Sequence, residues 1–329
     1  MIVKLNPVVE LSTSCQYGRS FELTASINFN QDLLITMNIC TKPISESLGK
    51  QIINADNKSI LEIDQEKIIG IFKTYGVLLF RGFTTDTNIF REFSNLFSKD
   101  FINYAGGAFN RRVINGDNTL LSVNDYQFGI KLHGEMYYQK NMPLMLWFYC
   151  ANPALEKGET TVCDGRQFFA QLSPDTRNIF AKNQLKFVVQ MTKEEWQKKY
   201  KIEDFQEFQK ICKSNYTNLK RYDDDSVCIE YICPAVISSR CGNHQVFINS
   251  ILPTMQLNPQ VLRFEDDSEI PAEVMTELNE IAERLTTEVA WRKGDILMID
   301  NTRIMHGRRD FTDEKRDIYI RLCSPAFSY

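Results

Sequence analysis

Histidine is scarce in this sequence, with three among 329 residues, and the nine cysteines include no Cys-x-x-Cys pair. The cysteines are scattered, and several of them lie in apolar runs, as Cys150, Cys228 and Cys323 do. Cysteine in such a run behaves as a small hydrophobic residue. We therefore expect reduced thiols in a cytoplasmic protein, with neither a disulfide scaffold nor a cysteine-rich metal site.

Neither sign of charge dominates the sequence. It holds 38 Lys and Arg against 42 Asp and Glu, which gives a net charge of −4. This balance provides no electrostatic reason to expect nucleic acid or an anionic membrane as a partner. No apolar run reaches the length of about 20 residues that a membrane span needs, and the first residues lack the apolar core of a signal peptide. We expect a small-molecule partner and leave homo-oligomerisation open.

Two of the three histidines stand in segments with metal-ligand spacing. His133 and Glu135 lie two residues apart within 132–136, and His306 lies far downstream. If 132–136 is a strand, the imidazole and the carboxylate project from the same face. A returning strand that carries His306 would complete two histidines and one carboxylate, the set that holds Fe(II) in non-haem oxygenases and leaves coordination positions open. Taken alone, His-x-Glu is also found by chance on exposed strands.

The pattern of apolar residues predicts many strands and a few helices. Asp64 and Gly76 have the residue types of a helix start and stop, and an apolar strand is expected at 77–80. Further strands are expected at 143–150, 227–231, 245–249, 295–300 and 318–323, and further helices near 89–97 and 274–285, with another that starts at 173–175. These elements favour one α+β domain over 1–329, built around an antiparallel double-sheet barrel.

Two regions are harder to interpret from their patterns. Residues 1–55 alternate short apolar runs with polar residues, which indicates edge strands and loops. Residues 190–225 are highly charged. We interpret 190–225 as solvated helix and loop and as a candidate lid insertion over the active site.

Four segments, in order along the chain, carry a resemblance to one family. They are YGVLLFRGF at 75–83, LHGE at 132–135, KGETTVCD at 157–164, and WRKGDILMIDN followed by HGR between 291 and 308. Together they resemble the taurine dioxygenase (TauD/TfdA) superfamily of Fe(II)- and 2-oxoglutarate-dependent dioxygenases. The resemblance implies a double-stranded β-helix, or distorted jelly roll, as the core, flanked by α-helices.

The same resemblance assigns the site. His133, Glu135 and His306 match the three metal ligands, and Thr160 matches the threonine that touches the co-substrate. The implied cofactors are Fe(II), 2-oxoglutarate and O2. The implied reaction is hydroxylation, desaturation or oxidative cyclisation at an unactivated C–H bond, with succinate and CO2 as co-products.

The carboxylate ligand departs from most of the family, which has aspartate where this sequence has Glu135. The clavaminate-synthase-like branch also has glutamate and acts largely on amino acids and their derivatives. This favours a small, carboxylate-bearing substrate derived from an amino acid, of the kind used in secondary metabolism. Halogenase relatives lack a carboxylate at this position, so halogenation is not expected.

The arginine that pairs with the distal carboxylate of 2-oxoglutarate has two candidates, Arg316 and Arg321. The apolar residues of 318–322 alternate, and we expect their face to lie under the helices, which turns Arg321 into the barrel. A buried guanidinium needs an anionic partner, and the co-substrate would supply one. We therefore predict Arg321, with Arg316 in reserve. The alternative is that Arg321 pairs with Asp317 or another acid.

The substrate-contacting candidates rest on weaker signals. Relatives place such residues near 241–249, which draws attention to Asn249 and His244, while Tyr137 and Arg308 flank the predicted ligands. Two other classes of protein remain alternatives to an oxygenase. One is a non-redox jelly-roll metalloprotein of cupin type, and the other is a non-catalytic binding protein on the same fold.

Overall fold

The computed structural model describes residues 39–46, 48–104 and 111–329. Asn38–Tyr329 form one compact unit. The expectation for residues 1–38 lies outside the described residues, so a single domain over 1–329 stays a prediction. Within the expected N-terminal region two strands are described, β1 (Cys40–Pro43) at the edge of a sheet and β2 (Lys50–Ile53) between β1 and the next strand.

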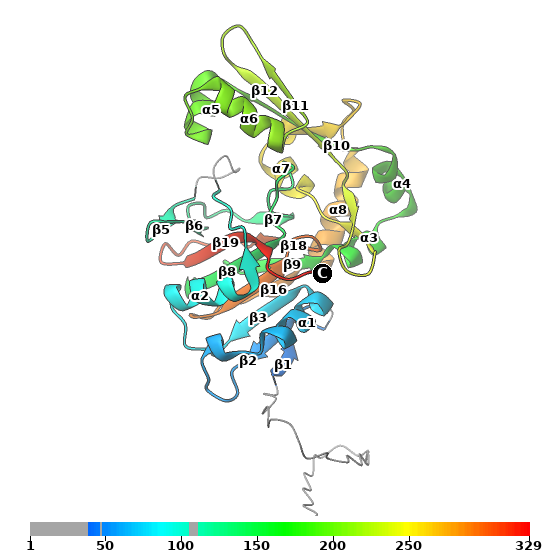
Figure 1. Ribbon diagram of the computed structural model, residues 1–329. Coiled ribbons are helices and arrows are strands. Elements are labelled where there is room, and N and C mark those ends of the chain that lie inside the picture. The colour runs from blue at the N-terminus through cyan, green and yellow to red at the C-terminus, as the bar shows by residue number, and fades with distance from the viewer. Residues whose placement is uncertain (1–38, 47, 105–110) are drawn as a thin grey trace, which may run out of the picture. The chain divides into compact units, whose positions relative to one another are not determined.

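The helices of the described chain surround a core of strands (Figure 1). They are α1 (Gln65–Tyr75), α2 (Thr87–Phe97), α3 (Gly165–Gln171), α4 (Pro174–Lys182), α5 (Lys193–Tyr200), α6 (Phe205–Asn215), α7 (Ile251–Leu257) and α8 (Ala272–Leu285). No helix in these described ranges has both the length and the apolar character that crossing a membrane requires.

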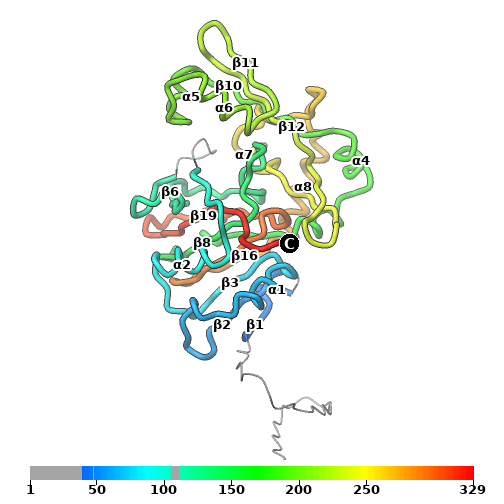
Figure 2. The backbone as a smooth tube through the Cα atoms, in the orientation of Figure 1, coloured from blue at the N-terminus to red at the C-terminus, as the bar shows by residue number. Residues whose placement is uncertain are grey.

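The strands form two principal sheets. In order across the larger sheet they are β1 (Cys40–Pro43), β2 (Lys50–Ile53), β3 (Val77–Arg81), β17 (Ile296–Asp300), β8 (Met145–Asn152), β19 (Asp317–Pro325), β6 (Asp117–Ser122) and β5 (Val113–Ile114), with β4 (Ser98–Lys99) beside β19. The smaller sheet has the order β16 (Thr287–Val289), β9 (Thr160–Asp164), β18 (Ile304–Arg308) and β7 (Ile130–His133). Strands far apart in sequence pair directly, as β8 and β19 do (Figure 2).

Two further sheets extend the fold beyond this core. One has the order β11 (Asn218–Arg221), β12 (Val227–Cys233), β10 (Leu185–Met191) and β15 (Leu262–Phe264), and the other pairs β13 (Val236–Ser238) with β14 (Gln245–Phe247). The predicted insertion at 190–225 therefore contains α5, α6 and β11. These elements share a small core of their own around Trp196 and Phe208. Whether the insertion acts as a lid stays a prediction.

The space between the two principal sheets is filled by apolar side chains from both. Phe148 of β8 and Ile320 of β19 meet Val162 of β9 and Ile304 of β18 there, all of them buried. The opposite face of the larger sheet is covered by α1 and α2, with Trp147 at the centre of that second cluster. A β-sandwich with helices packed on its outer face is the predicted double-stranded β-helix.

The N-terminal helix and strand form as the sequence predicts. Asp64 caps α1 by accepting a hydrogen bond from the backbone N–H of Lys67, and Gly76 ends the helix with a left-handed φ of 71°. A Cβ atom at Gly76 would also lie within 2.8 Å of the Arg303 guanidinium. The carbonyl of Gly76 accepts a hydrogen bond from the N–H of Asp300, at the end of β17. Only glycine fits this junction, which joins α1 to the segment that leads to His306.

Two expectations about strands were wrong. The strand expected at 132–136 ends at His133, and Glu135 lies in the following turn. In β19 the predicted facing is reversed, because Ile318, Ile320 and Leu322 pack between the sheets and Tyr319 packs toward the helices. Both faces of a central strand are buried in this fold, so alternation of apolar residues does not show which face is which.

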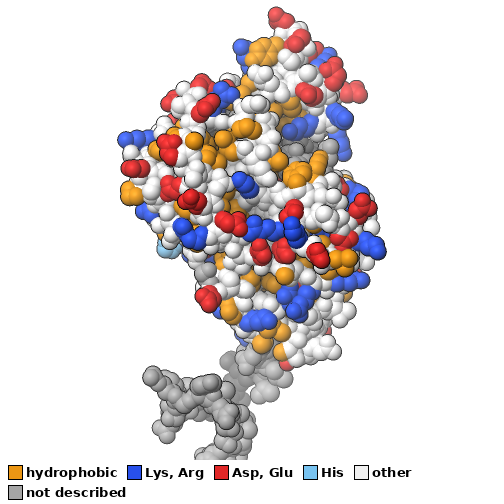
Figure 3. All heavy atoms as spheres, turned by 180° about the vertical axis from the view of Figure 1, so that it is seen from behind, with side chains coloured by type: hydrophobic (Ala, Val, Ile, Leu, Met, Phe, Trp, Pro, Cys, Tyr) orange, Lys and Arg blue, Asp and Glu red, His pale blue; other side chains and the backbone are white. Residues whose placement is uncertain are grey.

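Acidic and basic side chains are interspersed on the face of the molecule shown in Figure 3. This mixed surface agrees with the small net charge of the sequence. The eight cysteines at described positions form no disulfide, and five of them are buried.

Replacing Arg81 by alanine should lower the free energy of unfolding by about 3 kcal/mol. Its guanidinium contacts both carboxylate oxygens of Asp295, which is 1% exposed, and the substitution would leave that charge buried without its partner. The measurement is chemical denaturation followed by circular dichroism. Lys58→Ala removes an exposed ion pair with Asp56 and should change the free energy by no more than about 0.5 kcal/mol. Similar losses in both variants would contradict the prediction.

Candidate metal centre

The strand ladder of the smaller sheet brings the two predicted histidine ligands together. His133 ends β7 and lies directly opposite His306 in β18. Their ring centroids are 4.4 Å apart. Gly307 makes this close pairing feasible, because a Cβ at that position would meet the carbonyl oxygen of Ile130 at 2.5 Å.

Glu135 lies near the two histidines but belongs to a turn and not to a paired strand. Its N–H donates to Oδ1 of Asn301 over 2.8 Å, and Nδ2 of Asn301 donates to the carbonyl of Glu135 over 3.1 Å. Nδ2 of Asn301 also donates to the carbonyl of Pro143 over 2.7 Å. Asn301 begins the turn between β17 and β18 and is fully buried. It therefore couples the position of Glu135 to the turn that leads to His306.

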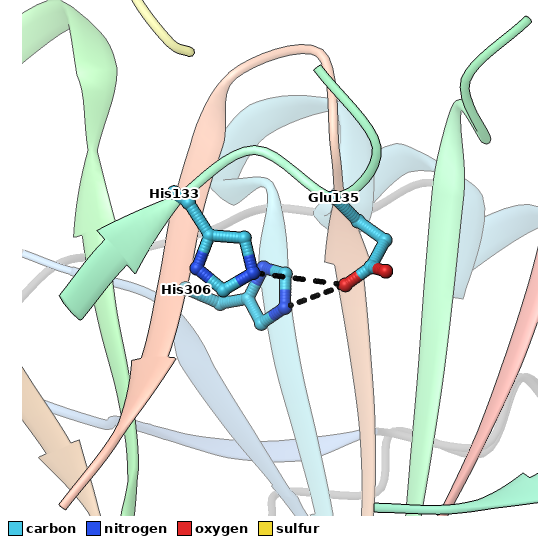
Figure 4. Close-up of side chains that lie close together, drawn as sticks. All are labelled: His133, Glu135 and His306. Carbon is cyan, nitrogen blue, oxygen red and sulfur yellow. Dashed lines mark ion pairs between the residues drawn. The ribbon is translucent and has the colours of Figure 1, made fainter. Parts of the chain in front are cut away.

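Three donor atoms of these residues converge on one point (Figure 4). Oε2 of Glu135 lies 3.7 Å from Nε2 of His133 and 3.3 Å from Nε2 of His306. The three ligand atoms lie within 4.8 Å of one another. Nδ1 of His133 lies 2.9 Å from the carbonyl oxygen of Lys131. That contact favours a proton on Nδ1 and leaves the lone pair of Nε2 directed at the cluster, as in histidine ligands of metals.

The charges of the cluster suit a divalent cation. Burial alone would raise the pKa of the Glu135 carboxyl, but the Arg111 guanidinium and the neighbouring imidazoles of His133 and His306 hold that pKa well below its ordinary value. Burial and the neighbouring His133 lower the pKa of His306 to about 4. At neutral pH, therefore, Glu135 is ionised and His306 is neutral, which are the protonation states that metal binding requires.

A cavity of about 380 Å³ contains the cluster. Its walls are mainly apolar and aromatic, with Phe187, Ile229 and Tyr231 on the side of β10 and β12. The insertion contributes Lys199, Tyr200 and Tyr216 to the same walls. A cavity of this size suits a small organic molecule beside a bound metal.

Thr160 and Arg316 line this cavity, close to each other in the fold. Oγ1 of Thr160 accepts a hydrogen bond from the indole of Trp291, and Nε of Arg316 donates to the carbonyl of Gly158, two residues before Thr160. Nη1 of Arg316 donates to Oδ1 of Asn124. Arg316 is 3% exposed and has no carboxylate within ion-pair distance in the described part of the chain. Burial and nearby Arg308 lower the pKa of Arg316 to about 9.

Arg321, the first choice for the co-substrate, lies on the other face of β19. Its Nη1 donates to Ser94 Oγ and Asn95 Oδ1 of α2 over 2.5 and 2.9 Å, and its Cζ lies 3.7 Å from the ring centroid of Phe101. This correction follows from the reversed facing of β19. The alternative pairing with Asp317 is absent as well, since Asp317 accepts from Tyr319 and Asn124 instead.

Three of the four substrate candidates do not line the cavity. Asn249 is buried and bonds the backbone of Ala235 and Ile251. His244 is exposed next to β14. The hydroxyl of Tyr137 donates to the carbonyl of Asn301, so this ring supports the turn and does not face a ligand.

Arg308 does line the cavity, but its terminal N–H groups are already engaged. Nη1 donates to the carbonyl of Val123, and Nη2 donates to those of Tyr126 and Phe128. Arg308 therefore fixes the loop before β7.

Sequence reasoning missed Arg111. Its Nη2 lies 2.8 Å from Oε1 of Glu135, in an ion pair in which both side chains are at most 10% exposed. The residue precedes β5 in a stretch with no periodicity, rich in Gly, Asn and Asp, so no pattern distinguishes it from its neighbour Arg112.

The fold and the cluster together first define a class of protein. Two histidines and one carboxylate at one point of a double-stranded β-helix, inside a cavity, form a mononuclear metal site with room for further ligands. A model of the TauD, TfdA family of taurine catabolism dioxygenases matches residues 41–323. The chain belongs to this family and is a dioxygenase. Membership confirms the predicted enzyme class, which uses iron, 2-oxoglutarate and O2.

Individual relatives are distant in sequence. A clavaminate synthase-like protein of Arabidopsis thaliana is 23% identical over 269 residues, covering 75% of this chain and 81% of the relative. The dapdiamide synthesis protein DdaC of Enterobacter agglomerans is 21% identical over 281 residues, covering 78% and 84%. The solved structure of PvcB from Pseudomonas aeruginosa matches with a TM-score of 0.57 at 13% identity, over 91% of this chain and 95% of PvcB. Likeness at that identity shows the fold alone, and the predicted fold class is confirmed.

Replacing Asn301 by alanine should weaken Fe(II) binding by about tenfold to a hundredfold, because Glu135 would lose both of its backbone hydrogen bonds to this side chain, and Pro143 would lose a third. Anaerobic titration with Fe(II), followed by equilibrium dialysis, measures this effect. Asn218→Ala, at an exposed position in β11, is the matched control and should leave the affinity unchanged. Equal Fe(II) affinity in the Asn301→Ala and wild-type proteins would contradict the coupling.

Proposed function

We propose that this protein is an Fe(II)- and 2-oxoglutarate-dependent oxygenase that oxidises an unactivated C–H bond of a small carboxylate-bearing metabolite. His133, Glu135 and His306 hold the metal. The convergence of their three donor atoms inside the cavity is the observation that carries the proposal. When bound, iron supplies the oxidative chemistry with O2, and 2-oxoglutarate supplies two electrons as it becomes succinate and CO2.

Arg316 and Thr160 bind the distal carboxylate of 2-oxoglutarate in this proposal. Arg316 is a buried cation that lines the cavity and has no carboxylate within ion-pair distance among the described residues, and a carboxylate is the group that satisfies a guanidinium with two parallel hydrogen bonds. Thr160 adds a hydroxyl from the neighbouring strand β9. The reserve residue of the sequence analysis thus replaces Arg321.

The remaining lining residues exclude water and orient the substrate. The walls from β10 and β12 are apolar, and the insertion at 190–225 contributes Tyr200 and Tyr216, whose hydroxyls lie 2.7 Å apart. We assign this insertion the role of a lid, which shields the reacting centre once substrate is bound.

The substrate class rests on the charges of the cavity and on similar proteins. Arginine in an apolar cavity favours an anionic ligand over a neutral one. DdaC is named for dapdiamide synthesis, and PvcB is described as an Fe, alpha-ketoglutarate dependent oxygenase from an isonitrile synthetic pathway. These names support a small metabolite, which we take to be derived from an amino acid.

Replacing His306 by alanine should abolish the weak visible absorption band that Fe(II) and 2-oxoglutarate produce together under anaerobic conditions, because the metal loses one of three protein ligands. His244→Ala is the control, since His244 is exposed and lies outside the cavity, and it should retain the band. A wild-type protein that gives no band would favour a non-redox metalloprotein or a binding protein. A normal band in His306→Ala would refute the ligand assignment.

Replacing Arg316 by methionine should weaken 2-oxoglutarate binding by about a hundredfold or more, because a charge-assisted pair of hydrogen bonds is lost. Arg321→Met removes an equally buried arginine on the opposite face of β19 and should leave that affinity within about threefold. Titration of the same visible band measures both. The reverse order of effects would restore the original choice of Arg321.

A further inference from the structure

Glu135 divides its two carboxylate oxygens between different partners. Oε2 faces the two histidine rings, at 3.7 and 3.3 Å from their Nε2 atoms. Oε1 accepts a hydrogen bond from Nη2 of Arg111 over 2.8 Å. Coordination of a metal through Oε2 alone would leave the contact with Arg111 intact, so this arginine is compatible with an occupied metal site.

The Arg111 guanidinium packs against an aromatic ring, and one of its terminal nitrogens has no hydrogen-bond partner. Its Cζ lies 3.8 Å from the ring centroid of Tyr104. The side chain is 10% exposed, and Nη1 is buried without any hydrogen-bond partner among the described residues. A buried cationic N–H without an acceptor is costly, because it has lost its water and gained nothing in return. Arg111 lines the cavity, so a ligand bound there would be the nearest source of the missing acceptor.

The other cations and acids of the cavity are engaged, assigned to the co-substrate or exposed, and Lys199 of the insertion is one of the exposed residues. Arg308 donates to backbone carbonyls, and Arg316 lies with Thr160 in the part assigned to 2-oxoglutarate. The described lining residues include two carboxylates, Glu135 itself and the exposed Asp125. Among the described lining residues, Nη1 of Arg111 is therefore the terminal guanidinium nitrogen that is buried without a partner, while the other partnerless nitrogens are Nε of Arg308 and Nδ1 of the metal-ligand candidate His306.

We propose that Arg111 is the residue that anchors the primary substrate, with Nη1 binding its carboxylate while Nη2 stays on Oε1 of Glu135. The ligand is an amphiphilic anion. Its carboxylate lies beside the metal ligand Glu135, and its apolar body packs against Phe187, Ile229 and Tyr231. This inference rests on the proposed function and adds to it the group that is recognised and the residue that recognises it.

The test compares acids with their uncharged counterparts. The probes are phenylacetate, 3-phenylpropanoate and 4-phenylbutanoate, each paired with its primary amide. Their affinities are measured anaerobically from the change in the visible band of the protein loaded with Fe(II) and 2-oxoglutarate. Probe-induced shifts in the thermal unfolding midpoint of the metal-free wild-type protein, the form in which Nη1 is unpaired, give a readout that does not depend on loading or activity.

In the wild-type protein at least one acid should bind about tenfold or more tightly than its amide. Arg111→Met should abolish this preference by weakening the acid and not the amide, and Arg111→Lys should retain part of it. The matched control is Arg112→Met, because Arg112 is 60% exposed, pairs with Asp317 at 3.7 Å and lies outside the cavity lining. This control should keep the whole preference.

Three results would overturn the proposal. They are equal binding of every acid and amide by the wild-type protein, a preference that survives in Arg111→Met, and a preference lost equally in Arg112→Met. If Arg111→Met does not fold, Arg111→Gln replaces it, and the absence of a preference in the wild-type protein overturns the proposal without any variant. If Arg111→Met loses 2-oxoglutarate binding while Arg316→Met keeps it, Arg111 binds 2-oxoglutarate and not the primary substrate, and the proposal is wrong.

Failure of this inference is distinguishable from failure of the proposed function. A wild-type protein without the visible band contradicts the oxygenase proposal, whatever the probes do. A wild-type protein with the band but without a preference for acids contradicts the anchor alone.

Discussion

The metal centre depends on the side-chain amide of Asn301. The ladder between β7 and β18 fixes the two histidines opposite each other, but Glu135 belongs to no strand and has no ladder to hold it. The amide supplies the missing constraint by bonding both the N–H and the carbonyl of Glu135. Because the same residue begins the turn into β18, this buried contact links the backbone of Glu135 directly to the turn that leads to His306.

The protonation states of Glu135 and His306 also suit a metal site. A carboxylate removed from water would normally take up a proton, and Glu135 stays ionised because Arg111 and the two imidazoles surround it. For His306, burial lowers the pKa and so favours the neutral imidazole, which has lost its proton. The site is thus prepared for a cation without requiring deprotonation of His306 at neutral pH.

The sequence was sufficient to predict the parts of this structure that local chemistry determines. Asp64 and Gly76 bound α1 because a side-chain cap and a left-handed glycine specify helix ends wherever they occur. The facing of β19 could not be predicted in the same way, because the strand is buried between a second sheet and the helices, and apolar side chains suit both faces. Because of that ambiguity, the sequence pattern favoured Arg321 over Arg316 as the arginine that binds 2-oxoglutarate. Arg111 escaped detection since its role comes from contact with Glu135, 24 residues away, and not from any period.

The arginines of the cavity explain how a mainly apolar site can still be selective. Arg308 has terminal N–H groups that the protein satisfies itself, so it shapes the loop before β7. Nη1 of Arg111 is a buried donor without a partner among the described residues, and Arg316 is a buried guanidinium with no carboxylate within ion-pair distance there. A neutral molecule of the right shape would bury those donors unpaired, and the resulting penalty acts against it and not against an anion. Under the proposed function, the apolar walls would therefore supply affinity for the body of a ligand, while the guanidinium groups of Arg111 and Arg316 would favour an anion over a neutral molecule.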